Sequence, residues 1–238
     1  MVILPSILDK TVSRPGQYGG SKRHLIPNAN MHAFWESVYK KIHQSFIPYV
    51  PFDGAEKLVN PCFGNFGVRY HPTKHIVGYF HAGLDFDGKI KTPITPILDG
   101  ILEYSGFGLV NGNYVMLSHP NVKTEDGFIL YSLYMHLRDV KVKFSSYQKM
   151  LREVSFHSYP KIPISHTLPI GTLGQTGGTG EYPHLHLQVE FRNEVGDIII
   201  VDPAEILGVP HSDNLSKAVN GKEKFKVFCE KYNIKQRG

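Results

Sequence analysis

The chain has 238 residues, 41% of them hydrophobic, which is enough to bury one large core or two small ones. Its 23 glycines, 16 prolines, 13 tyrosines and 14 phenylalanines favour short strands joined by turns and argue against a helical bundle. The formal net charge of +5 is spread along the chain, so no nucleic-acid-binding module is indicated. Two cysteines, Cys62 and Cys229, are too few for a disulfide scaffold and fit either one bridge or two free thiols.

The N-terminus has no basic start followed by a long apolar core, because Pro5 and Asp9 interrupt it. The sequence therefore predicts no signal peptide, and no apolar run is long enough to span a bilayer. We expect a soluble protein that has either lost its leader or reaches its site of action by another route.

Residues 1–59 are expected to form an N-terminal extension with one amphipathic helix. The extension begins with turn-rich sequence, and over residues 31–46 the side chains of Phe34, Val38 and Ile42 recur at helical spacing. We interpret the aromatic side chains of this segment as packing residues rather than as a binding surface.

Short apolar segments separated by glycine and proline follow the extension. One strand is expected to begin near His81 and to end at Asp87, before Gly88. A second strand is expected from Gly100 to Tyr104. The segment before it contains Pro93 and Pro96, which exclude that segment from the centre of a sheet.

Two further strands, at residues 113–120 and 127–137, are expected to form a hairpin with a polar loop between them. In the second strand, alternation places four side chains on one face: Leu130, Ser132, Tyr134 and His136. Residues 141–166 are interpreted as an insertion with a short helical stretch near 147–154, placed to overhang a cleft as a lid.

Residues 184–191, HLHLQVEF, follow a glycine-rich run and predict a half-buried strand. One face would carry His184, His186, Gln188 and Glu190, and the other Leu185, Leu187, Val189 and Phe191. Two imidazoles then point the same way from a rigid element, an arrangement that suits a metal site beside a reacting group. A last strand is expected at residues 198–201.

The partners for these imidazoles are a histidine and a carboxylate in His81-x3-Asp85, an even spacing on an extended chain. Together with His186 they offer two nitrogens and one oxygen, with a fourth position for water, as in catalytic zinc sites. The spacing His-x-His and the spacing His-x3-Asp are each expected roughly once or less by chance in a chain with 13 histidines and ten aspartates. The similar pair His71-x3-His75 is interpreted as a loop pair beside the site.

Several motifs occur in one order: FGNFGVRYHP, HAGLDFDG, TPITPILDGIL, YMHL, IGTLGQTG and PHLH. In sequence and spacing they resemble the lysostaphin-type (LytM-like) zinc metalloendopeptidases, which cut peptidoglycan cross-bridges. The resemblance covers roughly residues 60–207 and implies a metallopeptidase domain at 60–208. Residues 209–238 are expected to form a basic, partly helical tail. The predicted fold is mainly β, a sandwich-like antiparallel sheet that floors a groove, with a few peripheral helices.

The resemblance also implies the role of each residue at the site. His81, Asp85 and His186 correspond to the ligands of one zinc ion, and His136 and His184 to two catalytic histidines that do not bind the metal. The chain has no HExxH segment, so a histidine takes the work of the general base, and the sequence leaves open which of the two does so.

Two assignments near the site are made from the residues themselves. Asp87 is interpreted as a turn residue before Gly88 rather than as a second carboxylate ligand. Gln188 and Glu190 are interpreted either as side chains that support the ligands or as a solvated face.

The resemblance implies a zinc-dependent endopeptidase that acts on stem or cross-bridge peptides of peptidoglycan, in the cell envelope or outside the cell. Two alternatives stay open: a non-catalytic cell-wall-binding or regulatory module with the same fold, and a zinc peptidase that acts on ordinary peptides. The oligomeric state is not predicted.

Overall fold

The computed structural model describes residues 1–14, 23–55, 66–71, 76–144, 161–178 and 182–209. Four sequence-based expectations fall wholly or largely outside these residues and stay predictions: the pairing of the two cysteines, the His71 and His75 pair, the lid at 141–166 with its helical stretch near 147–154, and the basic tail.

The described residues form a mainly β fold, which confirms the predicted fold class. The strands are β1 Val2–Leu4, β2 Thr11–Ser13, β3 His24–Pro27, β4 Gly67–His71, β5 Ile76–His81, β6 Leu84–Asp87, β7 Pro93–Ile94, β8 Gly100–Gly108, β9 Gly112–Thr124, β10 Ile129–Leu137, β11 Asp139–Val140, β12 Ile162–Ile164, β13 Gly171–Thr172, β14 His184–Arg192 and β15 Ile198–Val201. The helical elements are η1 Leu8–Lys10, η2 Ala29–Met31, α1 His32–Ser45 and α3 Pro203–Leu207.

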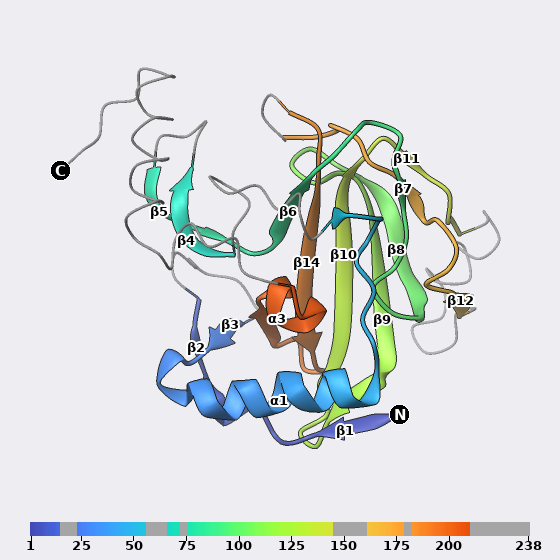
Figure 1. Ribbon diagram of the computed structural model, residues 1–238. Helices are drawn as coiled ribbons and strands as arrows, with labels where there is room; N and C mark the ends of the chain where they lie inside the picture. Colours follow the sequence, from blue (N-terminus) through green and yellow to red (C-terminus); the bar gives the residue numbers. More distant parts are fainter. Residues whose placement is uncertain (15–22, 56–65, 72–75, 145–160, 179–181, 210–238) are drawn as a thin grey trace.

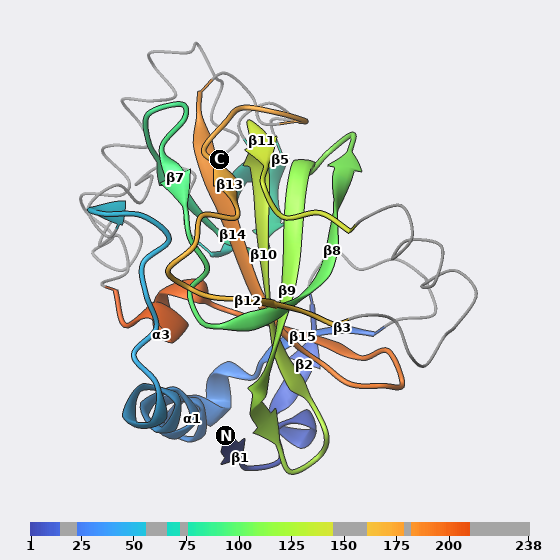
Figure 2. The same cartoon turned by 90° about the vertical axis from the view of Figure 1, so that its right-hand side faces the viewer.

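One large sheet runs in the order β12-β8-β9-β10-β14-β15-β3-β2 (Figures 1 and 2). Most neighbours are antiparallel, and the β1–β9 and β15–β3 pairs are parallel. β14 pairs with β10 along one edge, while β6 and β15 share its other edge. Hydrogen bonding on both sides makes β14 a rigid central strand of the sheet.

The predicted N-terminal helix is α1, and its buried side chains are Trp35, Val38, Tyr39 and Ile42. It lies across one end of the long strands (Figures 1 and 2). These four residues belong to the same hydrophobic core as the side chains of β14, so the N-terminal helix packs on the sheet that carries the site. Within the described residues, no helix combines the length and hydrophobicity that crossing a bilayer requires.

The predicted hairpin is confirmed as β9 and β10, but the loop between them is shorter than expected. Residues 121–124 extend β9 because its other edge gains a partner: Val122 to Thr124 pair with β1 at the N-terminus. Residues 121–124, which were predicted to be part of a loop, are therefore strand, because β1, more than 100 residues away in the sequence, pairs with them.

The single strand expected from His81 to Asp87 is wrong. The chain forms two strands here: β5 ends at His81 and pairs with β4, and β6 begins at Leu84 and pairs with β14. An extended chain would place His81 and Asp85 roughly 13 Å apart. The break between the strands instead brings the His81 Nε2 and Asp85 Oδ1 atoms within 3.2 Å.

Candidate metal centre

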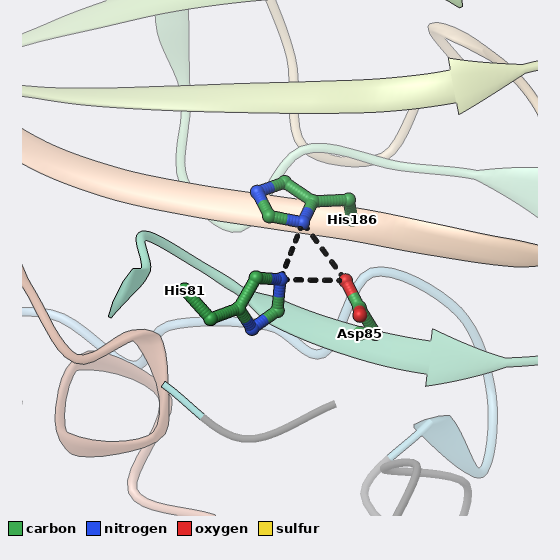
Figure 3. Close-up of side chains that lie close together, drawn as sticks. All are labelled: His81, Asp85 and His186. Carbon is green, nitrogen blue, oxygen red and sulfur yellow. Dashed lines mark hydrogen bonds and ion pairs between the residues drawn. The ribbon is translucent and has the colours of Figure 1, made fainter. Parts of the chain in front are cut away.

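Three side chains from three strands bring their donor atoms together (Figure 3). The His81 Nε2 and His186 Nδ1 atoms are 2.9 Å apart, and Asp85 Oδ1 lies 2.8 Å from His186 Nδ1. His81 and Asp85 are buried, and the His186 side chain is 12% exposed, so the cluster opens to solvent on the His186 side. Among the described residues this is the group of histidine, cysteine and acidic donors that can share one ion.

Strand pairing explains how the three residues meet. Asp85 on β6 lies directly opposite His186 on β14, in an antiparallel pair. Gly83, in the break between β5 and β6, allows the closest approach, because a Cβ atom there would lie 2.5 Å from His186 Nε2 and 2.5 Å from the Leu187 carbonyl oxygen. Only glycine fits against the back of the His186 ring without displacing it.

Electrostatics keep the carboxylate of Asp85 ionised. Burial by itself would raise the pKa of Asp85, but His81 and His186 beside it bring the pKa well below its usual value. The group therefore offers a charged oxygen ligand at neutral pH.

The donor set fits a zinc ion. Two imidazole nitrogens and one carboxylate oxygen are typical of catalytic zinc sites, which keep a further position for water or substrate. A tetrahedral ion with bonds of about 2.0–2.2 Å holds its ligand atoms roughly 3.3–3.6 Å apart. The donor atoms here are 2.8 to 3.2 Å apart, so small outward shifts are sufficient for all three to bind one ion.

His136 lies beside this cluster, with its ring centroid 4.9 Å from that of His184 and 5.9 Å from that of His186. The prediction that it shares a face with Tyr134 is wrong. Tyr134 pairs with Leu187, which points into the core, so regular alternation would bury His136 behind the sheet. An irregularity in the β9–β10 pairing and a left-handed backbone at His136 (φ 62°) turn its side chain to the metal face.

The rings of His136 and His184 are oriented by backbone carbonyl groups. His136 Nδ1 is 3.0 Å from the Thr176 carbonyl oxygen, and His184 Nδ1 is 3.1 Å from that of Tyr182. A carbonyl oxygen only accepts, so each Nδ1 carries the proton and each Nε2 is the acceptor of the neutral ring. His184 Nε2 lies 3.9 Å from Asp85 Oδ1.

Burial, and next to it the nearby His186 and His184, lower the pKa of His136 to about 3. The ring is therefore neutral at physiological pH. A neutral imidazole with a protonated Nδ1 is equipped to accept a proton at Nε2.

The face of β14 beyond the donor cluster is polar but mostly covered. Glu190 is 1% exposed, accepts a hydrogen bond from Gln188 Nε2 at 2.7 Å and pairs with Arg192. A solvated face, one of the two interpretations of these residues, does not describe Glu190. Asp87 was interpreted as a turn residue, but it is the last residue of β6 and pairs with His184 on β14.

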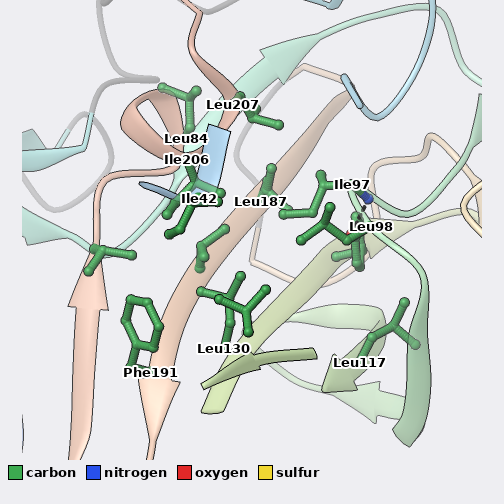
Figure 4. Packing of buried hydrophobic residues seen from close by; sticks show 14 of the residues in the cluster. Ile42, Leu84, Ile97, Leu98, Leu117, Leu130, Leu187, Phe191, Ile206 and Leu207 are labelled. Carbon is green, nitrogen blue, oxygen red and sulfur yellow. Dashed lines mark hydrogen bonds between the residues drawn. The ribbon is translucent and has the colours of Figure 1, made fainter. Parts of the chain in front are cut away.

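The opposite face of β14 packs into the core, as alternation predicts (Figure 4). Its four side chains are fully buried: Leu185, Leu187, Val189 and Phe191. Because this face is anchored on neighbouring strands and helices, the histidines on the other face project from a fixed backbone.

The five residues singled out from the sequence thus lie together, and three further residues that position them were not predicted. Gly83 admits the His186 ring, and the carbonyl groups of Thr176 and Tyr182 orient the two other histidines. For Thr176 the available signal was the glycine-rich run before HLHLQVEF, because such runs allow close backbone approach.

Comparison with known proteins gives one family match. The family model described as Peptidase family M23 matches residues 79–197, half of the chain. An uncharacterized metalloprotease of Buchnera aphidicola is 33% identical over 116 residues, which are 48% of this chain and 24% of that protein. Peptidoglycan DD-endopeptidase ShyC of Vibrio cholerae is 30% identical over 123 residues, 52% of this chain and 22% of its own length.

The chain spans about a quarter of the length of these curated relatives. Among solved structures, the antimicrobial peptidase lysostaphin from Staphylococcus simulans is 21% identical, with a TM-score of 0.44. That match covers 68% of this chain and 55% of the lysostaphin chain.

Proposed function

The chain belongs to peptidase family M23, and we propose that it is a zinc-dependent endopeptidase that hydrolyses stem or cross-bridge peptides of peptidoglycan. The observation that carries the proposal is the site itself: two imidazoles and a carboxylate with converging donor atoms, beside two further histidines. The substrate is suggested by the name of the ShyC relative, a peptidoglycan DD-endopeptidase. We propose residues 60–208 as the catalytic unit, acting in the cell envelope or outside the cell.

In this proposal His81 Nε2, Asp85 Oδ1 and His186 Nδ1 hold one Zn²⁺ ion. When bound, zinc supplies a Lewis acid and lowers the pKa of a bound water from near 16 to about 7. The negative charge of Asp85 offsets part of the charge of the ion, and the antiparallel pairing of β6 with β14 fixes the spacing of the ligands.

His136 and His184 handle the proton and the developing charge. Each is held through Nδ1 by a carbonyl group, so each presents Nε2 as the atom that exchanges a proton. One accepts a proton from the attacking water at Nε2 and later protonates the leaving amine, while the other, with a proton on Nε2 as well as on Nδ1, donates a hydrogen bond to the carbonyl oxygen as charge develops on it. The neutral His136 ring, with its proton on Nδ1, has an unprotonated Nε2 atom that can accept a proton.

The double variant His81→Ala with Asp85→Ala tests the proposal. It removes two of the three ligands, and we expect bound zinc to fall to background and hydrolysis of purified murein to stop. Zinc is measured by elemental analysis, and murein fragments are identified by mass, which also names the bond that is cut.

The matched control is the variant Asp9→Ala with His32→Ala, which removes the same two residue types from exposed positions. It should keep both zinc and activity. Survival of zinc and hydrolysis in the His81 and Asp85 variant would refute the site. Binding of murein without cleavage, insensitive to chelator, would favour a non-catalytic module, and cleavage of ordinary peptides alone would exclude the murein substrate.

A further inference from the structure

We propose that Thr176 is a positioning residue, whose hydroxyl group holds the ring and the unusual backbone of His136 in the geometry that the reaction needs. This role rests on the proposed function and adds to it a residue outside the donor cluster and the two histidines. Thr176 lies 40 residues from His136, within the glycine-rich segment that follows β13.

Thr176 contacts His136 and the residue after it through different atoms. Its carbonyl oxygen accepts from His136 Nδ1 at 3.0 Å, and its hydroxyl donates to the Leu137 carbonyl oxygen at 2.7 Å. The same hydroxyl accepts from the backbone N–H of Asn113 at 2.9 Å. One hydroxyl therefore ties the segment that orients the ring to both strands of the β9–β10 hairpin.

The backbone of His136 needs this support. Its φ of 62° is a left-handed conformation that residues other than glycine seldom adopt, so the surroundings must hold it. The His136 N–H donates to the Asn111 carbonyl oxygen at 2.9 Å, and Thr176 fixes the chain on the other side through Leu137. If the backbone relaxed to regular strand, alternation would turn the ring away from the metal face.

Close packing leaves Thr176 little room to move. A Cβ atom on Gly112 would lie 2.3 Å from both the carbonyl oxygen and the hydroxyl oxygen of Thr176. A Cβ atom on Gly177 would lie 2.3 Å from the Gly112 nitrogen. The two glycines let the backbones approach until the Thr176 hydroxyl reaches both of its partners.

A neighbouring threonine offers a matched control. The Thr172 hydroxyl donates to Asp139 Oδ2 at 2.8 Å, so it also links this segment to the chain just after His136. Within the part of the chain that the structure describes, Thr172 makes no hydrogen bond with His136. If the Thr176 hydroxyl only braced the loop, the same change at either position would have similar effects.

The experiment compares Thr176→Val, Thr176→Ser and Thr172→Val in the zinc-loaded full chain, with kcat and KM on murein peptides, zinc content and thermal unfolding. We expect Thr176→Val to lower kcat by about 10- to 100-fold, with KM within about twofold and zinc content unchanged, because misplacing a proton-transfer group costs the chemical step. Thr176→Ser, which keeps the hydroxyl, should restore most of kcat, and Thr172→Val should leave it unchanged.

A second measurement does not depend on activity. The ¹⁵N spectrum of the His136 ring, assigned by its loss in His136→Gln, should show a proton on Nδ1 in the parent chain and a mixture of tautomers in Thr176→Val. An unchanged tautomer, an unchanged kcat, or a loss that Thr172→Val shares would overturn the positioning role. An inactive parent chain with the expected tautomer change would reject the proposed function and keep the role of Thr176.

Discussion

At the residue scale, the site depends on small side chains as much as on its ligands. His81, Asp85 and His186 supply the donor atoms, but Gly83 decides whether the His186 ring has room beside the break between β5 and β6. A glycine between two ligands contributes no chemistry of its own. Its contribution is the absence of a Cβ atom at a point where two backbones and an imidazole meet.

Gly83→Ala is therefore expected to weaken zinc binding by about 10- to 100-fold, because the added methyl group would displace the His186 ring from its partners. Zinc affinity is measured by competition with a chromogenic chelator. The control is Gly108→Ala, where the nearest atoms would lie 3.8 Å from the new Cβ atom and no positive φ is involved. Equal zinc affinity in the two variants would contradict this steric account.

At the element scale, the sheet carries polar groups on both of its faces. On the core side, His119 of β9 contacts the Ser132 hydroxyl of β10 at 2.7 Å and the Asp99 carbonyl oxygen at 2.9 Å. The Tyr134 hydroxyl, two residues along β10, accepts from the Ile97 N–H at 2.8 Å. These bonds join β9 and β10 to the segment before β8 and satisfy polar groups that would otherwise be costly to bury.

His119 makes the stability of this part of the sheet sensitive to acid. Burial lowers its pKa to about 4, from an unfolded value near 6.5. Below pH 6.5 the unfolded chain takes up the proton first, so the free energy of unfolding falls as pH drops from about 6.5 to 4. This residue alone accounts for a loss of roughly 3 kcal/mol across that window.

Chemical denaturation at a series of pH values measures this effect. His119→Gln should be less stable than the parent chain at pH 7, because the network loses a partner, and its stability should depend less on pH between 6.5 and 4. If the free energies of unfolding of the two proteins changed equally between pH 6.5 and 4, His119 would not be the source of the acid sensitivity.

At the scale of the whole molecule, one hydrophobic core runs from the N-terminal strand to α3. It includes Val2 of β1, Ile42 of α1, Leu187 of β14 and Ile206 of α3. Figure 4 shows Ile42 and Ile206 close to the side chains of the central strands. The N-terminal segment therefore completes the core beneath the sheet that carries the metal centre.

Ile42→Ala is expected to lower the free energy of unfolding of the whole chain by about 2–5 kcal/mol, because it opens a cavity at a fully buried position. Urea denaturation followed by circular dichroism measures the change. Leu109→Ala, at a side chain that is 88% exposed, should change stability by no more than about 0.5 kcal/mol. A small effect of Ile42→Ala would mean that α1 does not share the core cooperatively.

Local patterns in the sequence were sufficient for several features. The two-residue period of β14 predicted which side chains are buried, helical spacing predicted α1, and the order of the motifs pointed to the family. The residues proposed for the site were also named from the sequence, because the motifs that contain these histidines and this aspartate follow one another in the order found in the family. Each of these signals lies within a short segment or in the order of such segments.

The tertiary structure decided what depends on residues far apart in the chain. Alternation assigned His136 to the wrong face, since its left-handed backbone is held by contacts with Asn111 and Thr176 rather than by its neighbours in sequence. The break after His81 and the extension of β9 also arise from pairing with distant strands. Periodicity describes how a strand continues, whereas long-range packing determines where it bends, and in this protein the bends bring the histidines together.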